Sequence, residues 1–179
     1  MNIIHINSNF PEFQSKRLKL RDIKNDDRIA IFNIRSNSEI NEFIDRNLPD
    51  SIEEIDSFIK KIKYSNKERS SYYWVIEDEG KRIIGTICLW NFSDDKRTAE
   101  IGYELLPEFQ KKGIMTESIN IVLTFAKYTL KLSSLYANTH KKNLPSIRLL
   151  LKTGFIYCSD MQDPENGNNI IFMNGFNAD

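Results

Sequence analysis

The sequence predicts an α+β protein whose central sheet is mixed but mostly antiparallel, with about seven strands and about four flanking helices. Three observations lead to this class. Segments that alternate polar and apolar residues mark strands, apolar residues at helical spacing mark helices, and three of the strands follow one another directly in mid-chain. Because helices and strands do not alternate throughout, a repeating βα barrel is excluded.

The first part of the chain predicts one strand and two helices. Residues 16–21 alternate polar and apolar side chains, as a half-buried strand does, and residues 26–35 predict a helix. A second helix begins after Ser51, which with Glu54 matches a capping box. The apolar stripe of that helix is formed by Ile52, Ile55, Ile59 and Ile62.

Three strands in succession follow, at residues 72–77, 82–90 and 98–106. A tight turn at residues 78–81 joins the first two, and Pro107 ends the third. We therefore expect an antiparallel meander.

Helix and strand alternate in the remainder of the chain. A helical stripe about four turns long runs from Met115 to Leu130. Pro145 suits the first turn of a further helix, and Gly154 suits its C-terminal cap. The remaining segments are short strands at 134–139, 155–158 and 170–174, and a polar loop at 159–169.

Size and charge exclude several classes of protein. The chain has 179 residues, about the length of one globular domain, so we expect residues 1–179 to form a single domain with a core over about 16–176. The 25 basic and 25 acidic residues cancel. Without a basic surplus we expect no direct nucleic-acid partner and no membrane partner, and any anion site must be local.

The start of the chain lacks the basic and apolar regions of a signal peptide, and no apolar run reaches the roughly 18 residues of a membrane helix. We therefore expect a cytoplasmic protein. Cys88 and Cys158 lie far apart within apolar runs, which predicts buried thiols rather than a disulfide. His5 and His140 have no ligand spacing between them, so no metal site is expected.

Residues 104–116 carry the strongest chemical signal. A strand that ends in a glycine-containing loop and opens a helix leaves backbone N–H groups unpaired at the positive end of the helix dipole, an arrangement that binds phosphate. Gly113 permits close approach, and Lys111 and Lys112 add charge. The G-x-x-x-x-G-K-[ST] and three-glycine dinucleotide patterns are both absent. Taken alone, the loop is better explained as an ordinary helix start with solvated lysines, because glycine-bearing turns are common.

Three motifs in order carry a resemblance to a known family: EIGYEL at 100–105, QKKGIMTE at 110–117, and NLPS at 143–146 followed by GF at 154–155. The sequence resembles the GNAT N-acetyltransferases, and within them the RimJ/RimL-like branch, over nearly the whole chain. The resemblance implies an acetyl-coenzyme A-dependent enzyme, with a three-layer fold and a splayed cleft in its sheet.

The resemblance also implies the coenzyme-binding residues. Family members cradle the coenzyme pyrophosphate with the backbone amides of a Q/R-x-x-G-x-G/A loop. Here that loop carries over to Gln110, Lys111, Lys112, Gly113, Ile114 and Met115. Met115 departs from the pattern by replacing the second small residue, which backbone amides tolerate because a side chain can point away. In the family's bulged strand, amides corresponding to those near Tyr103 and Leu105 would pair with pantetheine and polarise the thioester carbonyl, a contribution of roughly 3 kcal/mol per donor.

The implied catalytic groups are less sharply fixed. The Asn143 amide would hold pantetheine and Ser146 would donate to the departing thiolate, although both also fit simple helix capping. Glu100 would be the general base, and Glu165 is its rival because RimL-like enzymes place a carboxylate in the late loop. Both glutamates also fit solvated surface acids. Asn138 stands where other superfamily members have a glutamate.

The expected reaction is acetyl transfer to a primary amine by direct attack in a ternary complex. At pH 7, deprotonation costs about 1 kcal/mol for an α-amine and about 4.6 kcal/mol for a lysine, so a site without an obvious strong base favours a protein N-terminus. Two alternatives stay open: a non-catalytic acyl-coenzyme A-binding module, and an enzyme for a small amine such as a polyamine or aminoglycoside, attracted by acidic residues at 160–165. Monomer and homodimer are both compatible with the sequence.

Overall fold

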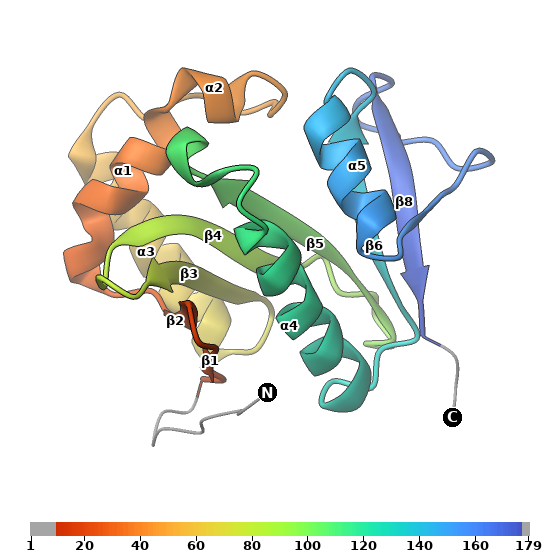
Figure 1. Ribbon diagram of the computed structural model, residues 1–179, viewed down its shortest axis with the longest axis horizontal. Coiled ribbons are helices and arrows are strands. Elements are labelled where there is room, and N and C mark those ends of the chain that lie inside the picture. The colour runs from red at the N-terminus through yellow and green to blue at the C-terminus, as the bar shows by residue number, and fades with distance from the viewer. Residues whose placement is uncertain (1–9, 177–179) are drawn as a thin grey trace.

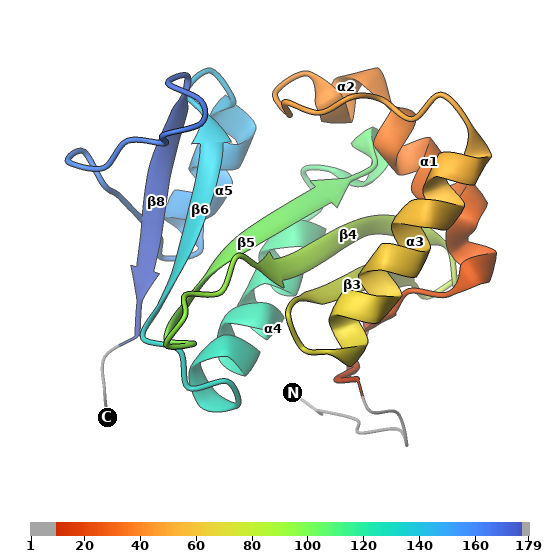
Figure 2. The ribbon, with the colours of Figure 1, turned by 180° about the vertical axis from the view of Figure 1, so that it is seen from behind.

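The computed structural model describes residues 10–176, so His5 lies outside the described residues. In that part of the chain one sheet of eight strands has helices on both faces, which confirms the predicted mixed α+β class (Figure 1, Figure 2). The strands are β1 Phe13–Gln14, β2 Leu18–Asp22, β3 Tyr72–Asp78, β4 Ile83–Trp90, β5 Thr98–Leu105, β6 Ser134–His140, β7 Ile156–Tyr157 and β8 Asn169–Gly175. The helices are α1 Arg28–Ser36, α2 Ser38–Asn41, α3 Ile52–Lys67, α4 Ile114–Tyr128 and α5 Leu144–Lys152, with 3-10 helices η1 Asn25–Asp27 and η2 Pro107–Phe109.

The strand order is β1-β2-β3-β4-β5-β6-β8-β7. Every neighbouring pair is antiparallel except β5 and β6. Those two run parallel and pair only at Thr98–Ser134, Ala99–Leu135 and Glu100–Tyr136. Beyond these pairs β5 and β6 diverge in a V, as both ribbon views show (Figure 1, Figure 2), and we call the unpaired stretch between the two strands the opening.

The expected bulge in β5 is not seen on its β4 side. Pairing with β4 runs from Glu100 to Leu105 without a register shift, and the irregularity in this part of the sheet lies between Ile76 and Glu77 of β3. The opening therefore arises because β5 leaves β6, while β5 stays in register with β4.

Local sequence explains several helix boundaries. Ser51 Oγ accepts a hydrogen bond from Glu54 N at 3.4 Å, so Ser51 is the N-cap expected for α3. Gly154 follows α5 with φ of 86°, as a glycine at a helix C-terminus does. The helix predicted at 26–35 starts instead as η1, because Asp27 is buried against Arg21 and accepts from Lys24 N at 2.7 Å.

Two apolar clusters hold the layers together. The larger packs α4 on one face of the sheet, where Trp74 and Phe125 meet edge to face at a centroid distance of 5.7 Å. The smaller packs α1 and α3 on the other face through Ile31, Ile55 and Ile59. We call these the α4 face and the α3 face.

Some expectations need correction. Phe10 and Phe13 are buried in the larger cluster, so the core begins before residue 16 because β1 packs under α4. Cys88 and Cys158 are free thiols, as expected, but both are only partly buried; Cys88 packs against the smaller cluster, and Cys158 follows the edge strand β7. Within residues 10–176, no helix combines the length and apolar character needed to cross a bilayer.

Candidate active site

Strand β5 presents different chemistry on its two faces. Ala99, Ile101 and Leu105 belong to the larger cluster, and Tyr103 packs against it, so these residues lie on the α4 face. Because side chains alternate along a strand, Glu100 and the other intervening residues face α3. One strand thus carries a phenol towards α4 and a carboxylate towards α3.

Backbone donors of β5 face the opening between β5 and β6. Leu106 N donates to Ile84 O in the direction of β4 at 2.9 Å. Alternate residues of an antiparallel pair direct their N–H groups to the same neighbour, so those of Tyr103 and Leu105 point the other way. The two amides expected to pair with pantetheine therefore lie on the edge of β5 that β6 leaves uncovered.

The loop before α4 has the geometry of an anion site. Gly113, with φ of 75°, is the N-cap of α4, and Lys111 also has a left-handed φ, of 59°. Alternating backbone conformations of this kind turn successive N–H groups into a concave nest. The first donor into α4 is Glu117 N, which reaches Gly113 O at 3.0 Å. Within residues 10–176, none of the six preceding N–H groups, 111 to 116, donates to a protein acceptor.

Gln110 is placed differently from the rest of the predicted loop set. Its N–H already donates to Pro107 O at 3.1 Å, so it is not open to a ligand. Its side chain donates to Leu105 O at 3.1 Å and so ties the loop to the end of β5. Met115 is buried in the core, and its side chain leaves the outer side of the helix start clear, as expected for a non-glycine residue there.

Arg17 anchors the loop from the other end of the sequence. Its guanidinium donates to Lys112 O at 3.2 Å and to Glu117 Oε2 in the first turn of α4, with Nε at 3.0 Å. From the sequence Arg17 is predicted only as part of a strand, because nothing local to residue 17 shows that it faces a loop 95 residues away.

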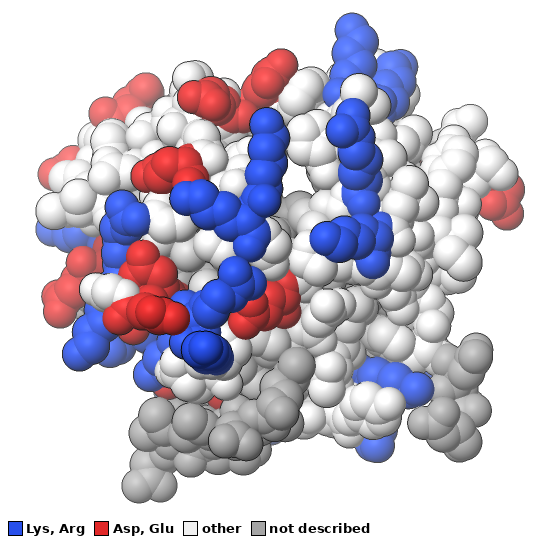
Figure 3. Space-filling view, viewed as in Figure 1, with Lys and Arg blue, Asp and Glu red and all other residues white. Residues whose placement is uncertain are grey.

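Basic side chains stand on both sides of the opening. Figure 3 shows lysine and arginine side chains over the start of α4 and over α5, with a hollow between the two groups. Lys111 and Lys112 are exposed at the start of α4, and Lys141, Lys142 and Arg148 are exposed at or near α5. Free amides flanked by cations fit the diphosphate of a coenzyme.

Asn143 and Ser146 open α5 on the far side of the opening. Asn143 Oδ1 accepts from Ser146 N at 3.2 Å, so the capping role weighed for Asn143 is present. Its backbone N–H donates to His140 O at 2.8 Å. Ser146 Oγ lies 2.9 Å from Tyr103 Oη. The sequence predicts a role only for the backbone of Tyr103, so this contact of its phenol is not anticipated.

Glu100 lies on the α3 face at the point where β5 and β6 part. Asn91 Nδ2 donates to one carboxylate oxygen at 2.6 Å, and Asn138 Nδ2 lies 3.4 Å from the other. Burial raises the pKa of Glu100, the Asn91 hydrogen bond opposes that rise, and the charges of Asp163 and Glu165 add to it. Glu165 is exposed, and its N–H donates to Asp163 Oδ1 at 2.9 Å. The structure thus brings both predicted base candidates into one electrostatic site.

Two loops meet near His140, at the end of β6. One follows α2, at residues 42–51, and the other is the acidic loop at 158–168. Phe43 stacks near His140 at a centroid distance of 5.5 Å, and Asn166 Nδ2 lies 3.4 Å from Asp45 Oδ2. Arg46 of the loop at 42–51 also forms an ion pair with Glu104 of β5, and the two side chains are only 15% and 14% exposed. These contacts were not predicted, because the loop at 42–51 carries no motif.

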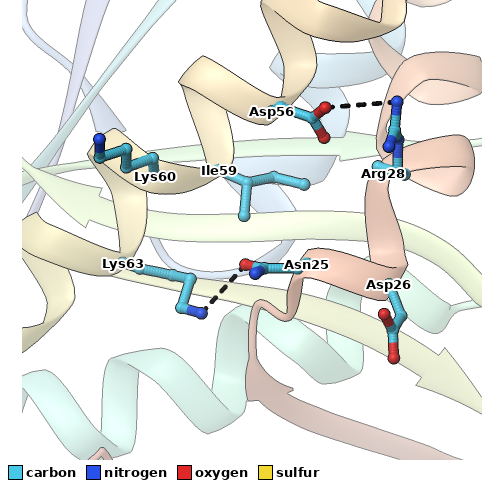
Figure 4. A pocket seen from close by; sticks show the side chains of 7 residues that line it. All are labelled: Asn25, Asp26, Arg28, Asp56, Ile59, Lys60 and Lys63. Carbon is cyan, nitrogen blue, oxygen red and sulfur yellow. Dashed lines mark hydrogen bonds and ion pairs between the residues drawn. The ribbon is translucent and has the colours of Figure 1, made fainter.

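A cavity of about 520 Å³ lies elsewhere, between α3 and the start of α1 (Figure 4). Its charged groups are of both signs and partly paired with each other, as Arg28 is with Asp56 at 3.3 Å. None of the predicted site residues line it. In the described part of the chain, no three histidine, cysteine or acidic side chains are grouped so as to hold a metal ion.

Comparison with known proteins assigns the chain to the acetyl-coenzyme A-dependent N-acetyltransferases. Within that class it belongs to the GNAT family, whose acetyltransferase domain model matches residues 17–156. The uncharacterised N-acetyltransferase YoaA of Bacillus subtilis is 37% identical over 147 residues, which cover 82% of this chain and 83% of the relative.

Solved structures confirm the fold. The ribosomal-protein-S5-alanine acetyltransferase of Vibrio fischeri has a TM-score of 0.80 at 20% identity, covering 92% of this chain and 96% of its own. The spermidine N-acetyltransferase of Vibrio cholerae, in complex with coenzyme A and spermine, has a TM-score of 0.75 at 24% identity, covering 89% and 94%. The predicted family and fold are thereby confirmed.

Proposed function

We propose that this N-acetyltransferase transfers the acetyl group of acetyl-coenzyme A to the primary α-amine of a protein N-terminus, by direct attack in a ternary complex. The observation that carries the proposal is the opening between β5 and β6, which pair at only three positions. The free N–H groups of Tyr103 and Leu105 line that opening and are suited to bind pantetheine as an extra strand. The free amides from Lys111 to Met115 are suited to bind the pyrophosphate.

The two faces of β5 support a division between donor and acceptor. Ser146 and the phosphate-binding loop lie with α4 and α5, so the coenzyme would enter from the α4 face. Glu100 lies on the α3 face, about 10 Å along the strand from Tyr103 at 3.3 Å per residue. The amine would therefore approach from the α3 face, and the thioester would meet it within the opening.

Proton handling in the proposed reaction follows from this placement. Glu100 would accept a proton from the attacking amine, directly or through water, and its raised pKa makes it a stronger base than an ordinary glutamate. Asn91 and Asn138 hold its carboxylate. Ser146 would donate a hydrogen bond to the departing thiolate. Glu165 would act on Glu100 through its charge, since no contact within hydrogen-bond distance joins them among the described residues.

The acceptor preference rests on deprotonation energy and on space. A single glutamate with a raised pKa suits an α-amine, whose deprotonation at pH 7 costs about 1 kcal/mol, better than a lysine. The loops at 42–51 and 158–168 touch across the α3 face, which favours a slender acceptor such as the end of an extended peptide. The cytoplasmic location expected from the sequence remains a prediction.

The test has two stages. Calorimetric titration with coenzyme A measures donor binding, and mass spectrometry then follows acetylation of peptides with free N-termini. The matched control is the same peptide with a blocked N-terminus and a free lysine. We expect acetylation of the free N-terminus and a large loss of turnover in Glu100→Gln with coenzyme binding unchanged. Failure to bind the coenzyme, or acetylation confined to the lysine side chain, would contradict the proposal.

A second acceptor class is favoured by one specific observation. Glu100, Asp163 and Glu165 interact electrostatically on the acceptor side, and Asp45 contacts the same loop. Such a group of carboxylates attracts an amine that carries further positive charges. Spermidine and spermine in the same assay test this class. Turnover of polyamines but not of peptides would assign the site to small cationic amines.

A further inference from the structure

The Tyr103 hydroxyl joins the two sides of the opening. Tyr103 belongs to β5, Ser146 belongs to the first turn of α5, and α5 packs on β6 and β7. The 2.9 Å separation of the two hydroxyl oxygens therefore links the strand that would flank the pantetheine with the helix expected to act on its sulfur. The Tyr103 ring packs against the larger apolar cluster, so its hydroxyl has a fixed position.

The direction of this hydrogen bond depends on what else accepts the Ser146 proton. Burial raises the pKa of Tyr103 to about 12, so the phenol keeps its proton throughout the neutral range. The geometry allows either hydroxyl to donate, and each can rotate to suit its neighbours. When a thiolate accepts the Ser146 proton, Tyr103 donates and Ser146 Oγ accepts. Within residues 10–176, Ser146 Oγ has no other protein partner, so its own proton is left for a further acceptor.

We propose that Tyr103 is a positioning residue that orients the Ser146 hydroxyl and strengthens its hydrogen bond to the departing thiolate of coenzyme A. The inference rests on the proposed function and adds a side-chain role to a residue expected to act only through its backbone. Consecutive hydrogen bonds polarise one another, so donation by Tyr103 makes Ser146 a better donor.

The balance of the step leaves both hydroxyl protons in place. The bond from amine nitrogen to acetyl carbon forms, the carbon–sulfur bond breaks, and its electron pair goes to sulfur. The amine proton goes to Glu100. A thiol has a pKa of about 8.5, so its thiolate is too weak a base to take the proton of Tyr103. Tyr103 and Ser146 thus stabilise the thiolate by hydrogen bonding, and no net proton transfer from either is needed.

The test titrates the thiol of bound coenzyme A by its ultraviolet absorbance and needs no acceptor amine. In the wild type we expect the pKa of the bound thiol to lie about one unit below that of the free coenzyme, a tenfold change in its ionisation constant. Ser146→Ala should remove this shift. Tyr103→Phe should remove about half of the pKa shift, which is roughly a threefold change in the ionisation constant. In the Ser146→Ala background, Tyr103→Phe should cause no further change in the thiol pKa.

The controls separate orientation from stability. Tyr157→Phe removes a hydroxyl on the exposed edge strand β7 and should leave the thiol pKa unchanged. Coenzyme affinity measured below the thiol pKa, and the melting temperature, report whether Tyr103→Phe merely disturbs the fold. The inference would be overturned if Tyr103→Phe left the thiol pKa unchanged. It would also be overturned if Tyr103→Phe changed the thiol pKa equally in the wild type and in Ser146→Ala. Failure of the wild type to bind coenzyme A would instead reject the proposed function itself.

Discussion

Replacing Gly113 by alanine isolates the role of the phosphate-binding loop. Gly113 has φ of 75°, and a Cβ there would meet only Arg17 Nη2, at 3.9 Å, an ordinary contact. The cost is therefore conformational rather than steric, about 1 kcal/mol for a residue with a side chain in the left-handed region. For a chain of this length we expect the melting temperature to fall by roughly 2–4 °C.

The effect of Gly113→Ala on coenzyme binding should be larger than its effect on stability. If the loop relaxes to a negative φ, its N–H groups turn away from a common point. Loss of one hydrogen bond to a charged phosphate is worth about 1.5–3 kcal/mol, so affinity for coenzyme A should fall roughly 10- to 100-fold. Calorimetric titration measures this change.

Gly154→Ala provides a matched control. Gly154 also has a left-handed φ, of 86°, but it follows the C-terminal end of α5, away from the loop. A Cβ there would lie 3.2 Å from Asn174 Nδ2, so its stability cost should be at least as large. Its affinity for coenzyme A should stay within about twofold of the wild type. Equal losses of affinity in the two variants, or no loss in Gly113→Ala, would refute the reasoning.

Three further variants probe the surroundings of the site. Arg17→Met should change the free energy of unfolding by less than about 1 kcal/mol, because the ion pair of Arg17 with Glu117 is partly exposed. It should nevertheless weaken coenzyme A binding several-fold, because the loop loses its hydrogen bond from Arg17 to Lys112 O. Chemical denaturation measures the first effect and calorimetry the second. Because the pKa of Glu100 is raised in the folded state, the stability of the wild type should fall as pH rises through that pKa. Glu100→Gln should lose this pH dependence. Thermal melts across the pH range measure both. Arg46→Met leaves the Glu104 carboxylate unpaired and little exposed, so we expect the free energy of unfolding to fall by about 2 kcal/mol and KM for the amine to rise. A loss of coenzyme affinity as large as the rise in KM would argue against a role confined to the acceptor side.

Sequence periodicity predicted the long elements well, because their hydrophobic patterns reflect burial directly. Helix α3 with its Ser51 cap and the meander β3-β4-β5 lie where the sequence placed them. Strand β1 and helix α2, with two and four residues, were missed. Elements this short have too little sequence for a period to show, and tertiary contacts decide whether they form.

The candidate site likewise has a part that could be predicted from local sequence and a part that could not. The loop around Gly113 could be predicted because its chemistry is local: a strand end, a glycine and a helix start. The clamp from Arg17 to Lys112 and the contact of Tyr103 with Ser146 span 95 and 43 residues of sequence. Such pairs are set by how the sheet brings its strands together, and a single sequence carries no periodic signal for them.

The short β5–β6 contact has a consequence for the energetics of the whole molecule. Because β5 and β6 pair at only three positions, the sheet lacks the backbone hydrogen bonds that a longer parallel pairing of these strands would supply. A ligand seated there would complete the sheet, so ligand binding and folding are thermodynamically linked. At a free coenzyme concentration of 100 times Kd, the linkage adds about 2.7 kcal/mol to the free energy of unfolding. Amide hydrogens of β5 and β6 should then exchange more slowly, in the strands on either side of the filled gap.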